Sequence, residues 1–171
     1  MRQNKQTEVD TRQIALIAVM GALIMALTFI RLQTLAGGYV HLGDIAINFA
    51  ALAFGPVVGA VAGGVGTGLA DVVGGYPIFT ITSILVHGAQ GYIVGRIAHG
   101  KTDYISLTSA VVVGGVIVVL GYYISEALFL LGRGEALLEV SPNIMQELTG
   151  MVGIVVYLAV RRAYPPIIRH S

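Results

Sequence analysis

Long apolar runs separated by short polar segments fill most of this chain. A membrane-spanning helix needs about 20 mostly apolar residues, and six runs reach or approach that length. They predict helices at residues 13–30, 44–55, 57–73, 78–97, 105–131 and 143–164. The second run is short, and Gly55-Pro56 ends it because proline cannot continue the helical hydrogen-bond ladder. The pattern predicts an all-α membrane protein with six transmembrane helices in a single domain, residues 1–171.

The lysines and arginines of the connecting segments predict the orientation. One side receives Arg2, Lys5, Arg12, Arg96, Lys101, Arg161, Arg162 and Arg169, whereas the other receives Arg31 and Arg133. An excess of basic residues marks the cytoplasmic side, so both termini are predicted in the cytoplasm. The predicted location is a prokaryotic plasma membrane, which the chain crosses several times. Residues 1–11 are polar and the following apolar run is long, which indicates a retained helix and no cleaved signal. The segment from Leu32 to Gly43 then lies outside, where Tyr39–Leu42 are predicted to form a short strand or a lid.

Polar side chains within the apolar runs gather near the outer side of the predicted membrane. They are Asp44, Asn48, Asp71, Thr80, Ser83, His87, Tyr122, Tyr123, Glu126, Asn143, Gln146 and Glu147. Ionisable groups at this depth are costly and usually mark a substrate or ion path. The sequence therefore predicts a small-molecule pocket that opens to the outside.

Helical spacing groups these polar residues into faces. Thr80, Ser83, His87 and Gln90 share one face, Tyr122 and Glu126 a second, and Asn143, Gln146 and Glu147 a third. Convergent polar groups among apolar walls are typical of a small-ligand site. Glu126 and Glu147 are suited to accept hydrogen bonds from an amine or a ring N–H. His87 and Tyr122 are suited to contact a heteroaromatic ring.

Some polar residues have an equally simple structural interpretation. Asp44 is a favoured residue type for capping the second helix, and Asp71 is placed to bond the glycine-rich turn that follows it. Thr67 is expected to bond back to its own helix. Glu135 and Glu139 fall in a predicted loop and are expected to be solvated.

Composition excludes several classes of protein. The chain is 56% hydrophobic and only 11% charged, whereas soluble domains are about 25% charged. Net charge is +1 and the longest basic run is Arg161-Arg162, which argues against nucleic-acid binding. There is no cysteine, and no P-loop, HExxH or GxSxG motif appears, so neither an enzyme nor a cofactor is predicted. His41, His87, His99 and His170 lie far apart in the predicted topology, so no metal site is predicted, although His41 with Asp44 offers two ligands.

Small residues recur on two of the predicted helices. On the first helix Ala18, Ala22 and Ala26 repeat every four residues. Such a stripe lets another helix approach closely, either within this chain or from a partner. Gly59 and Gly63 form a similar stripe on the third helix, which is expected to pack internally.

Residues 40–97 carry a family resemblance. The stretches Val40-His41-Leu42-Gly43-Asp44, Ala51-Leu52-Ala53-Phe54-Gly55-Pro56, Gly63-Gly64-Val65-Gly66-Thr67-Gly68-Leu69-Ala70-Asp71 and Gly75-Tyr76-Pro77 resemble the substrate-binding S component of an energy-coupling factor (ECF) transporter. The likeness extends over essentially the whole chain. It is strongest for the branch with carriers of hydroxymethylpyrimidine, pyridoxine-like and riboflavin-like vitamins.

The resemblance implies a function and partners. S components are six-helix membrane proteins that bind a vitamin or its precursor near the outer face, beneath a gate loop between helices one and two. They do not hydrolyse ATP; they dock onto a transmembrane coupling subunit with two ABC-type ATPases and topple in the membrane to deliver the substrate. The implied substrate contacts are Tyr39, His41, His87, Tyr122, Glu126, Asn143 and Glu147, and the implied coupling-subunit contacts are Ala18, Ala22 and Ala26.

Two departures from the family pattern bear on the ligand. The nearest branch has a lysine where His87-Gly88 stands here. The cobalt and nickel branch begins with a Met-His pair, whereas this chain begins Met1-Arg2, which argues against metal as the substrate.

Three other functions remain open from the residues. A proton-coupled solo transporter would use Glu126, Glu147 or His87 as a relay. A small intramembrane enzyme would use His87 with Asp71 or Glu126. A structural subunit of a larger complex would bind no ligand.

Overall fold

The computed structural model describes residues 11–164, which are almost entirely helical. The elements are α1 (Thr11–Thr28), β1 (Arg31–Gln33), β2 (Tyr39–His41), α2 (Gly43–Phe54), α3 (Pro56–Gly74), the 3-10 turn η1 (Pro77–Phe79), α4 (Thr80–Ala98), α5 (Tyr104–Ser125), the π-helical turn η2 (Glu126–Leu130), α6 (Arg133–Gly150) and α7 (Val152–Ala163). Arg2, Lys5, Arg169 and His170, and the Met1-Arg2 start of the chain, lie outside the described residues.

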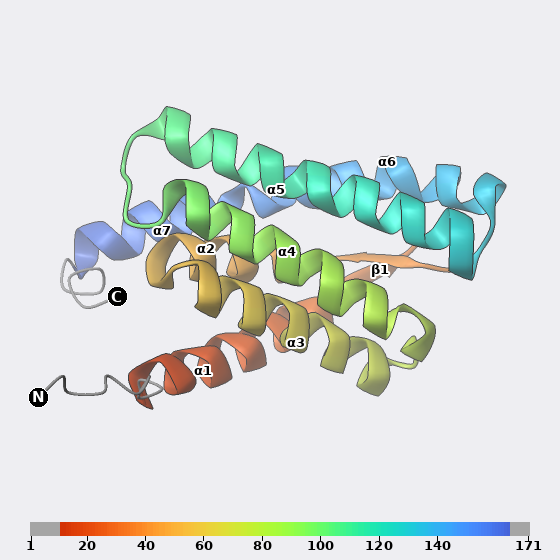
Figure 1. The fold of residues 1–171 in the computed structure, drawn as a ribbon, viewed down its shortest axis with the longest axis horizontal. Coiled ribbons are helices and arrows are strands. Elements are labelled where there is room, and N and C mark those ends of the chain that lie inside the picture. The colour runs from red at the N-terminus through yellow and green to blue at the C-terminus, as the bar shows by residue number, and fades with distance from the viewer. Residues whose placement is uncertain (1–10, 165–171) are drawn as a thin grey trace, which may run out of the picture.

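The helices run up and down along one common direction (Figure 1). α1 begins and α7 ends at the same end of the molecule, whereas the β1–β2 segment and the α3–α4 and α5–α6 turns lie at the opposite end. Five helical segments are long and apolar enough to cross a membrane: Thr11–Thr28, Pro56–Gly74, Pro77–Ala98, Tyr104–Leu130 and Arg133–Ala163. With the shorter apolar α2, these segments give the predicted all-helical membrane architecture.

The first five predicted helices coincide with helical segments of the structure to within two residues at each end, when α5 is taken together with the π-helical turn η2 that continues it. As predicted, Gly55-Pro56 separates α2 from α3, with Gly55 at a positive φ of 91° and Pro56 at the first helical position. The sixth prediction was wrong at its start, because the helix begins at Arg133 and contains Pro142. The predicted loop of residues 132–142 is therefore mostly the first part of α6. The predicted single helix continues from α6 into α7, with one interruption at Met151.

The predicted strand at Tyr39 is present and forms a hairpin with β1. The two strands pair antiparallel, with Arg31 opposite His41 and Gln33 opposite Tyr39. This hairpin, residues 31–41, lies in the half of the bundle that contains the α3–α4 and α5–α6 turns, and its labelled strand β1 runs roughly along the helices (Figure 1). It therefore lies at the end of the molecule that holds the polar residues of α3, α4 and α6.

Glycines allow α3 to pack directly against neighbouring backbones. A Cβ on Gly59 would lie 2.8 Å from the carbonyl oxygen of Gly91, and one on Gly64 would lie 2.6 Å from that of Ile84. The prediction of internal packing for this stripe is confirmed. Close contact between α3 and α4 fixes the positions of Asp71 and His87, which approach the hairpin from these two helices.

Candidate functional site

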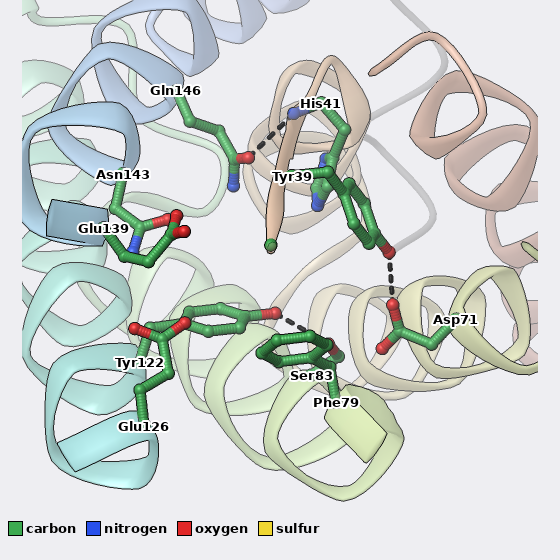
Figure 2. Close-up of a pocket in the computed structure, with 11 residues that line it drawn as sticks. Tyr39, His41, Asp71, Phe79, Ser83, Tyr122, Glu126, Glu139, Asn143 and Gln146 are labelled. Carbon is green, nitrogen blue, oxygen red and sulfur yellow. Dashed lines mark hydrogen bonds between the residues drawn. The ribbon is translucent and has the colours of Figure 1, made fainter. Parts of the chain in front are cut away.

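A small cavity lies beneath the hairpin (Figure 2). Its wall consists of Gly38, Tyr39, His41, Asp71, Phe79, Ser83, Tyr122, Glu126, Glu139, Asn143 and Gln146. These residues come from the hairpin, α3, η1, α4, α5, η2 and α6, so segments far apart in sequence converge on it. The volume is about 20 Å³, which is room for one water molecule. A larger ligand can enter only if some of these side chains move.

The hairpin is bonded to both sides of the cavity. On one side the Tyr39 hydroxyl donates to Asp71 Oδ1, and on the other the His41 backbone N–H donates to Gln146 Oε1 at 2.8 Å (Figure 2). Thr34 adds a bond to Glu139 on α6. The hairpin therefore bridges α3 and α6 above the cavity.

A single arginine, Arg31, reinforces the α3 side of this bridge. Arg31 Nη2 donates to the carbonyl oxygen of Gly74 at 2.8 Å. Its guanidinium carbon lies 4.8 Å from the ring centres of both Tyr39 and Tyr76, within the range of a cation–π interaction. Arg31 thus holds the hairpin against the turn between α3 and η1.

Side chains of α4, α5 and η2 form the opposite wall. The hydroxyls of Ser83 and Tyr122 share a hydrogen bond of 2.6 Å (Figure 2). Glu126 begins the π-helical turn and is buried although it stands at the end of a long apolar helix. Such turns occur frequently at functional sites. Here the turn carries a carboxylate into the cavity wall.

Below the cavity lies a second group of buried polar residues, which we call the polar floor: Asp44, Asn48, His87, Gln90 and Glu147. His87 Nδ1 lies 3.2 Å from Asp44 Oδ1 and 2.9 Å from Gln90 Oε1. Gln90 Nε2 in turn donates to Glu147 Oε2 at 3.1 Å. A continuous polar chain thus runs from α2 through α4 to α6.

The hairpin histidine connects the cavity to the polar floor. The ring of His41 lies 5.3 Å from that of His87, and its Nδ1 lies 3.7 Å from Asp44 Oδ2 while accepting the N–H of Gly43 at 3.0 Å. Burial lowers the pKa of His41 to about 4, which keeps its ring neutral at ordinary pH. The prediction that the histidines lie far apart was wrong for His41 and His87, because the hairpin folds back over α4. Ligand atoms of His41, Asp44 and His87 lie within 4.8 Å of one another, which would suit a metal ion.

The structure brings all seven predicted substrate contacts into this region. Tyr39, His41, Tyr122, Glu126 and Asn143 line the cavity. His87 and Glu147 belong to the polar floor. Their role in binding stays a prediction.

The wall also contains six residues that were missing from the predicted contacts: Gly38, Asp71, Phe79, Ser83, Glu139 and Gln146. Gln146 had been grouped with Asn143 by spacing, so a signal for it existed. Glu139 was predicted to be solvated and is buried, because α6 starts early and places it on the face of Ala136 and Asn143. Glu135, one turn earlier, is exposed as expected.

The structural interpretations of other polar residues have mixed outcomes. Asp44 does not cap α2, since its carboxylate makes no capping bond and faces the histidines. The Asp71 carboxylate binds Tyr39 of the hairpin, whereas only its backbone carbonyl binds the turn, at Tyr76. Thr67 donates to the carbonyl oxygen of Gly63 at 2.8 Å, which confirms its back-bond.

The alanine stripe of α1 faces away from the bundle. Ala18, Ala22 and Ala26 are exposed, whereas Met20, Ile24 and Thr28 form the buried face of the same helix. Packing of this stripe within the chain is thereby ruled out for the described residues. Contact with a partner subunit stays a prediction.

Comparison with known proteins gives consistent matches. The model of the family described as "ECF-type riboflavin transporter, S component" matches residues 8–162. An uncharacterized protein of Pyrococcus woesei is 43% identical over 115 residues, covering 67% of this chain and 76% of that protein. The thiamine precursor transporter HmpT of Lactococcus lactis subsp. cremoris (strain MG1363) is 32% identical over 138 residues, covering 77% of this chain and 78% of that protein.

A solved structure of the S component of a bacterial ECF transporter has the same fold. It superposes with a TM-score of 0.65 over 93% of this chain and 98% of that chain, at 19% sequence identity. The fold, the family match and the apolar helices agree on a multi-pass membrane protein. The chain belongs to the vitamin branch of the S components of ECF transporters.

Proposed function

We propose that this protein captures a small heteroaromatic vitamin or vitamin precursor, of the hydroxymethylpyrimidine, thiamine or pyridoxine type, from outside the cell. The observation that carries the proposal is the buried set of hydrogen-bonding side chains beneath the hairpin. Aromatic rings of Tyr39, His41 and Tyr122 provide stacking surfaces, and carboxylates and amides beside them provide bonds to ring substituents. The name of the Lactococcus relative, a thiamine precursor transporter, supports the same ligand class.

Uptake requires partners that the family supplies. We place the hairpin as the gate, on the outer side, with both termini in the cytoplasm. The exposed stripe Ala18, Ala22 and Ala26 contacts the transmembrane coupling subunit, which carries two ABC-type ATPases. ATP-driven toppling in the lipid bilayer then delivers the ligand inward, and this chain itself acts as no enzyme and takes no cofactor.

A thermal-shift screen of the purified, detergent-solubilised protein tests the proposal. The panel contains 4-amino-5-hydroxymethyl-2-methylpyrimidine, thiamine, pyridoxine, pyridoxamine and riboflavin. A ligand that binds only the native state adds about 2.7 kcal/mol of stability at 100 times its Kd, so one member should raise the unfolding midpoint clearly. Tyr122→Phe should reduce that shift, whereas Glu135→Gln at an exposed position should preserve it. Absence of any shift across the panel would overturn the proposal.

A further inference from the structure

The polar floor and the cavity are separated by two aromatic side chains. His41 of the hairpin and Tyr122 of α5 line the cavity from opposite sides (Figure 2). Their rings also contact His87, with ring centres at 5.3 and 5.6 Å. Because the cavity is only about 20 Å³, a heteroaromatic ring must displace such side chains to fit. Displacement of His41, which belongs to the hairpin, exposes the polar floor directly.

The polar floor contains more acceptors than donors. Within the described chain, Asp44 Oδ2, Asn48 Oδ1 and Glu147 Oε1 are buried and have no hydrogen-bond partner, whereas Asp44 Oδ1 faces His87 Nδ1 at 3.2 Å. Against these three acceptor atoms stands one unpartnered ring nitrogen, His87 Nε2. Asp44, Asn48 and His87 are completely buried. Buried acceptors without donors are costly, so this arrangement is suited to a group that brings N–H bonds.

The charges of the region point the same way. The polar floor holds two carboxylates, Asp44 and Glu147, and a single imidazole, His87. The cavity wall above adds Asp71, Glu126 and Glu139, and among residues 11–164 neither the wall nor the polar floor contains a lysine or an arginine. Arg31 stands behind the wall, where it packs on the ring of Tyr39 and donates to Gly74. Burying carboxylates without matching positive charge is unfavourable. A positively charged or amine-bearing ligand would supply the missing partner.

We infer that the polar floor is a recognition site for an amino group of the ligand. This inference rests on the proposed function, and it narrows the substrate class to amine-bearing heteroaromatic compounds. The ring occupies the space between His41 and Tyr122, and its amino group donates to Asp44 and Glu147. Ligands of the same size that carry a hydroxyl or an oxo group at that position leave the acceptors unpaired and bind more weakly.

Matched ligand pairs test this selection by isothermal titration calorimetry. The first pair is 4-amino-5-hydroxymethyl-2-methylpyrimidine and its 4-hydroxy counterpart; the second is pyridoxamine and pyridoxine. In at least one pair the amine should bind the wild-type protein about tenfold more tightly, a difference of about 1.4 kcal/mol. Asp44→Asn and Glu147→Gln should each bring the two members of that pair close to equal affinity. Glu135→Gln is the matched control and should keep the wild-type preference, since Glu135 is exposed and belongs neither to the cavity wall nor to the polar floor.

Both amide variants keep the shape of the side chain, and thermal unfolding checks their folding. If one variant fails to fold, the other still decides the question. Equal affinity within both pairs, or an amine preference that survives in a folded variant, would overturn the inference. Binding of a vitamin without an amino group, with neither amine bound, would also overturn it while leaving the proposed function intact. Absence of binding by every vitamin would instead overturn the proposed function.

A metal ion is the competing partner for the same acceptors. His41, Asp44 and His87 have ligand atoms within 4.8 Å of one another, a donor set that suits divalent transition metals. Elemental analysis of the purified wild-type protein therefore accompanies the titrations. Less than a tenth of an equivalent of metal is the expected result. A stoichiometric metal that is lost in Asp44→Asn would overturn the inference, because the acceptors would then already be paired.

Discussion

The bond between Tyr39 and Asp71 allows a quantitative test of the hairpin as a cover. Tyr39 donates from β2 to a carboxylate on α3 whose residue is only 1% exposed, and the second oxygen of that carboxylate has no hydrogen-bond partner. Burial raises the pKa of Tyr39 above its ordinary value, and the negative charge of the neighbouring Asp71 raises it further. The hydroxyl is therefore a proton donor throughout the working pH range.

Tyr39→Phe removes this donor and keeps the ring. A hydrogen bond to a charged group contributes about 1.5–3 kcal/mol, and the buried acceptor loses its partner. A change of about 2 kcal/mol corresponds to a factor of about 30 in an equilibrium. Since the bond joins the hairpin to α3, most of this change should appear as easier opening of the hairpin.

Hydrogen exchange of the backbone amides of residues 31–41 measures that opening. These amides should exchange about 30-fold faster in Tyr39→Phe, while amides of the α3–α4 core keep their wild-type rates. Tyr76→Phe is the matched control: it removes the 2.6 Å bond between Gln33 Nε2 and the Tyr76 hydroxyl, which is exposed. Exposed changes usually stay within about 0.5 kcal/mol. Equal exchange rates in the two variants would refute the argument that Tyr39 locks the hairpin.

Four further changes have defined outcomes. Glu126→Ala should weaken ligand binding by roughly 1–3 kcal/mol through loss of a buried hydrogen bond, and unchanged affinity in calorimetry would contradict this role. Gly64→Ala would place a Cβ 2.6 Å from a backbone carbonyl of α4 and should lower the unfolding midpoint, whereas Gly134→Ala, with no atom within 4 Å, should leave it unchanged. Ala22→Leu should preserve ligand binding but reduce ATP-driven uptake in proteoliposomes with the coupling module; wild-type uptake would exclude this stripe from docking. Burial lowers the pKa of His41 from 6.5 to about 4, so acidification protonates the unfolded state first and the unfolding midpoint should fall between these pH values, less steeply in His41→Gln.

The helices could be predicted because their apolar runs are long, and the one failure shows the limit of that signal. Residues 133–142 include Arg133, Glu135, Glu139 and Pro142, a composition that a search for apolar spans assigns to a loop. In the structure Ala136, Glu139 and Asn143 lie on one buried face of α6. Glu139 is tolerated there because Thr34 of the hairpin donates to it. That partner is more than 100 residues away, so local sequence could not reveal it.

From the residues alone, the site could be predicted as a polar region near one end of the helices, without the contacts between its side chains. Spacing placed Ser83 and His87 on one face of a helix and gave the outer end of the bundle its polar residues. It could not show that His41 folds back over His87, because the angle at which a hairpin returns depends on bonds such as that from His41 to Gln146. Nor could it distinguish Asp44 as a cap from Asp44 as a buried acceptor. That choice depends on the histidines that tertiary packing brings to it.

In the proposed mechanism, one short strand connects closure of the cavity to selection of the ligand. Tyr39 and His41 are two residues apart in β2, so both side chains point to the same face, and both line the cavity. The first holds the hairpin on Asp71, and the second covers the acceptors of the polar floor. Displacing β2 must therefore break the lock and uncover the floor together. An amine-bearing ligand donates hydrogen bonds to Asp44 and Glu147 and thereby regains part of the free energy that opening the hairpin costs. A ligand without such donors pays the same cost and regains less, so opening favours the amine-bearing compound.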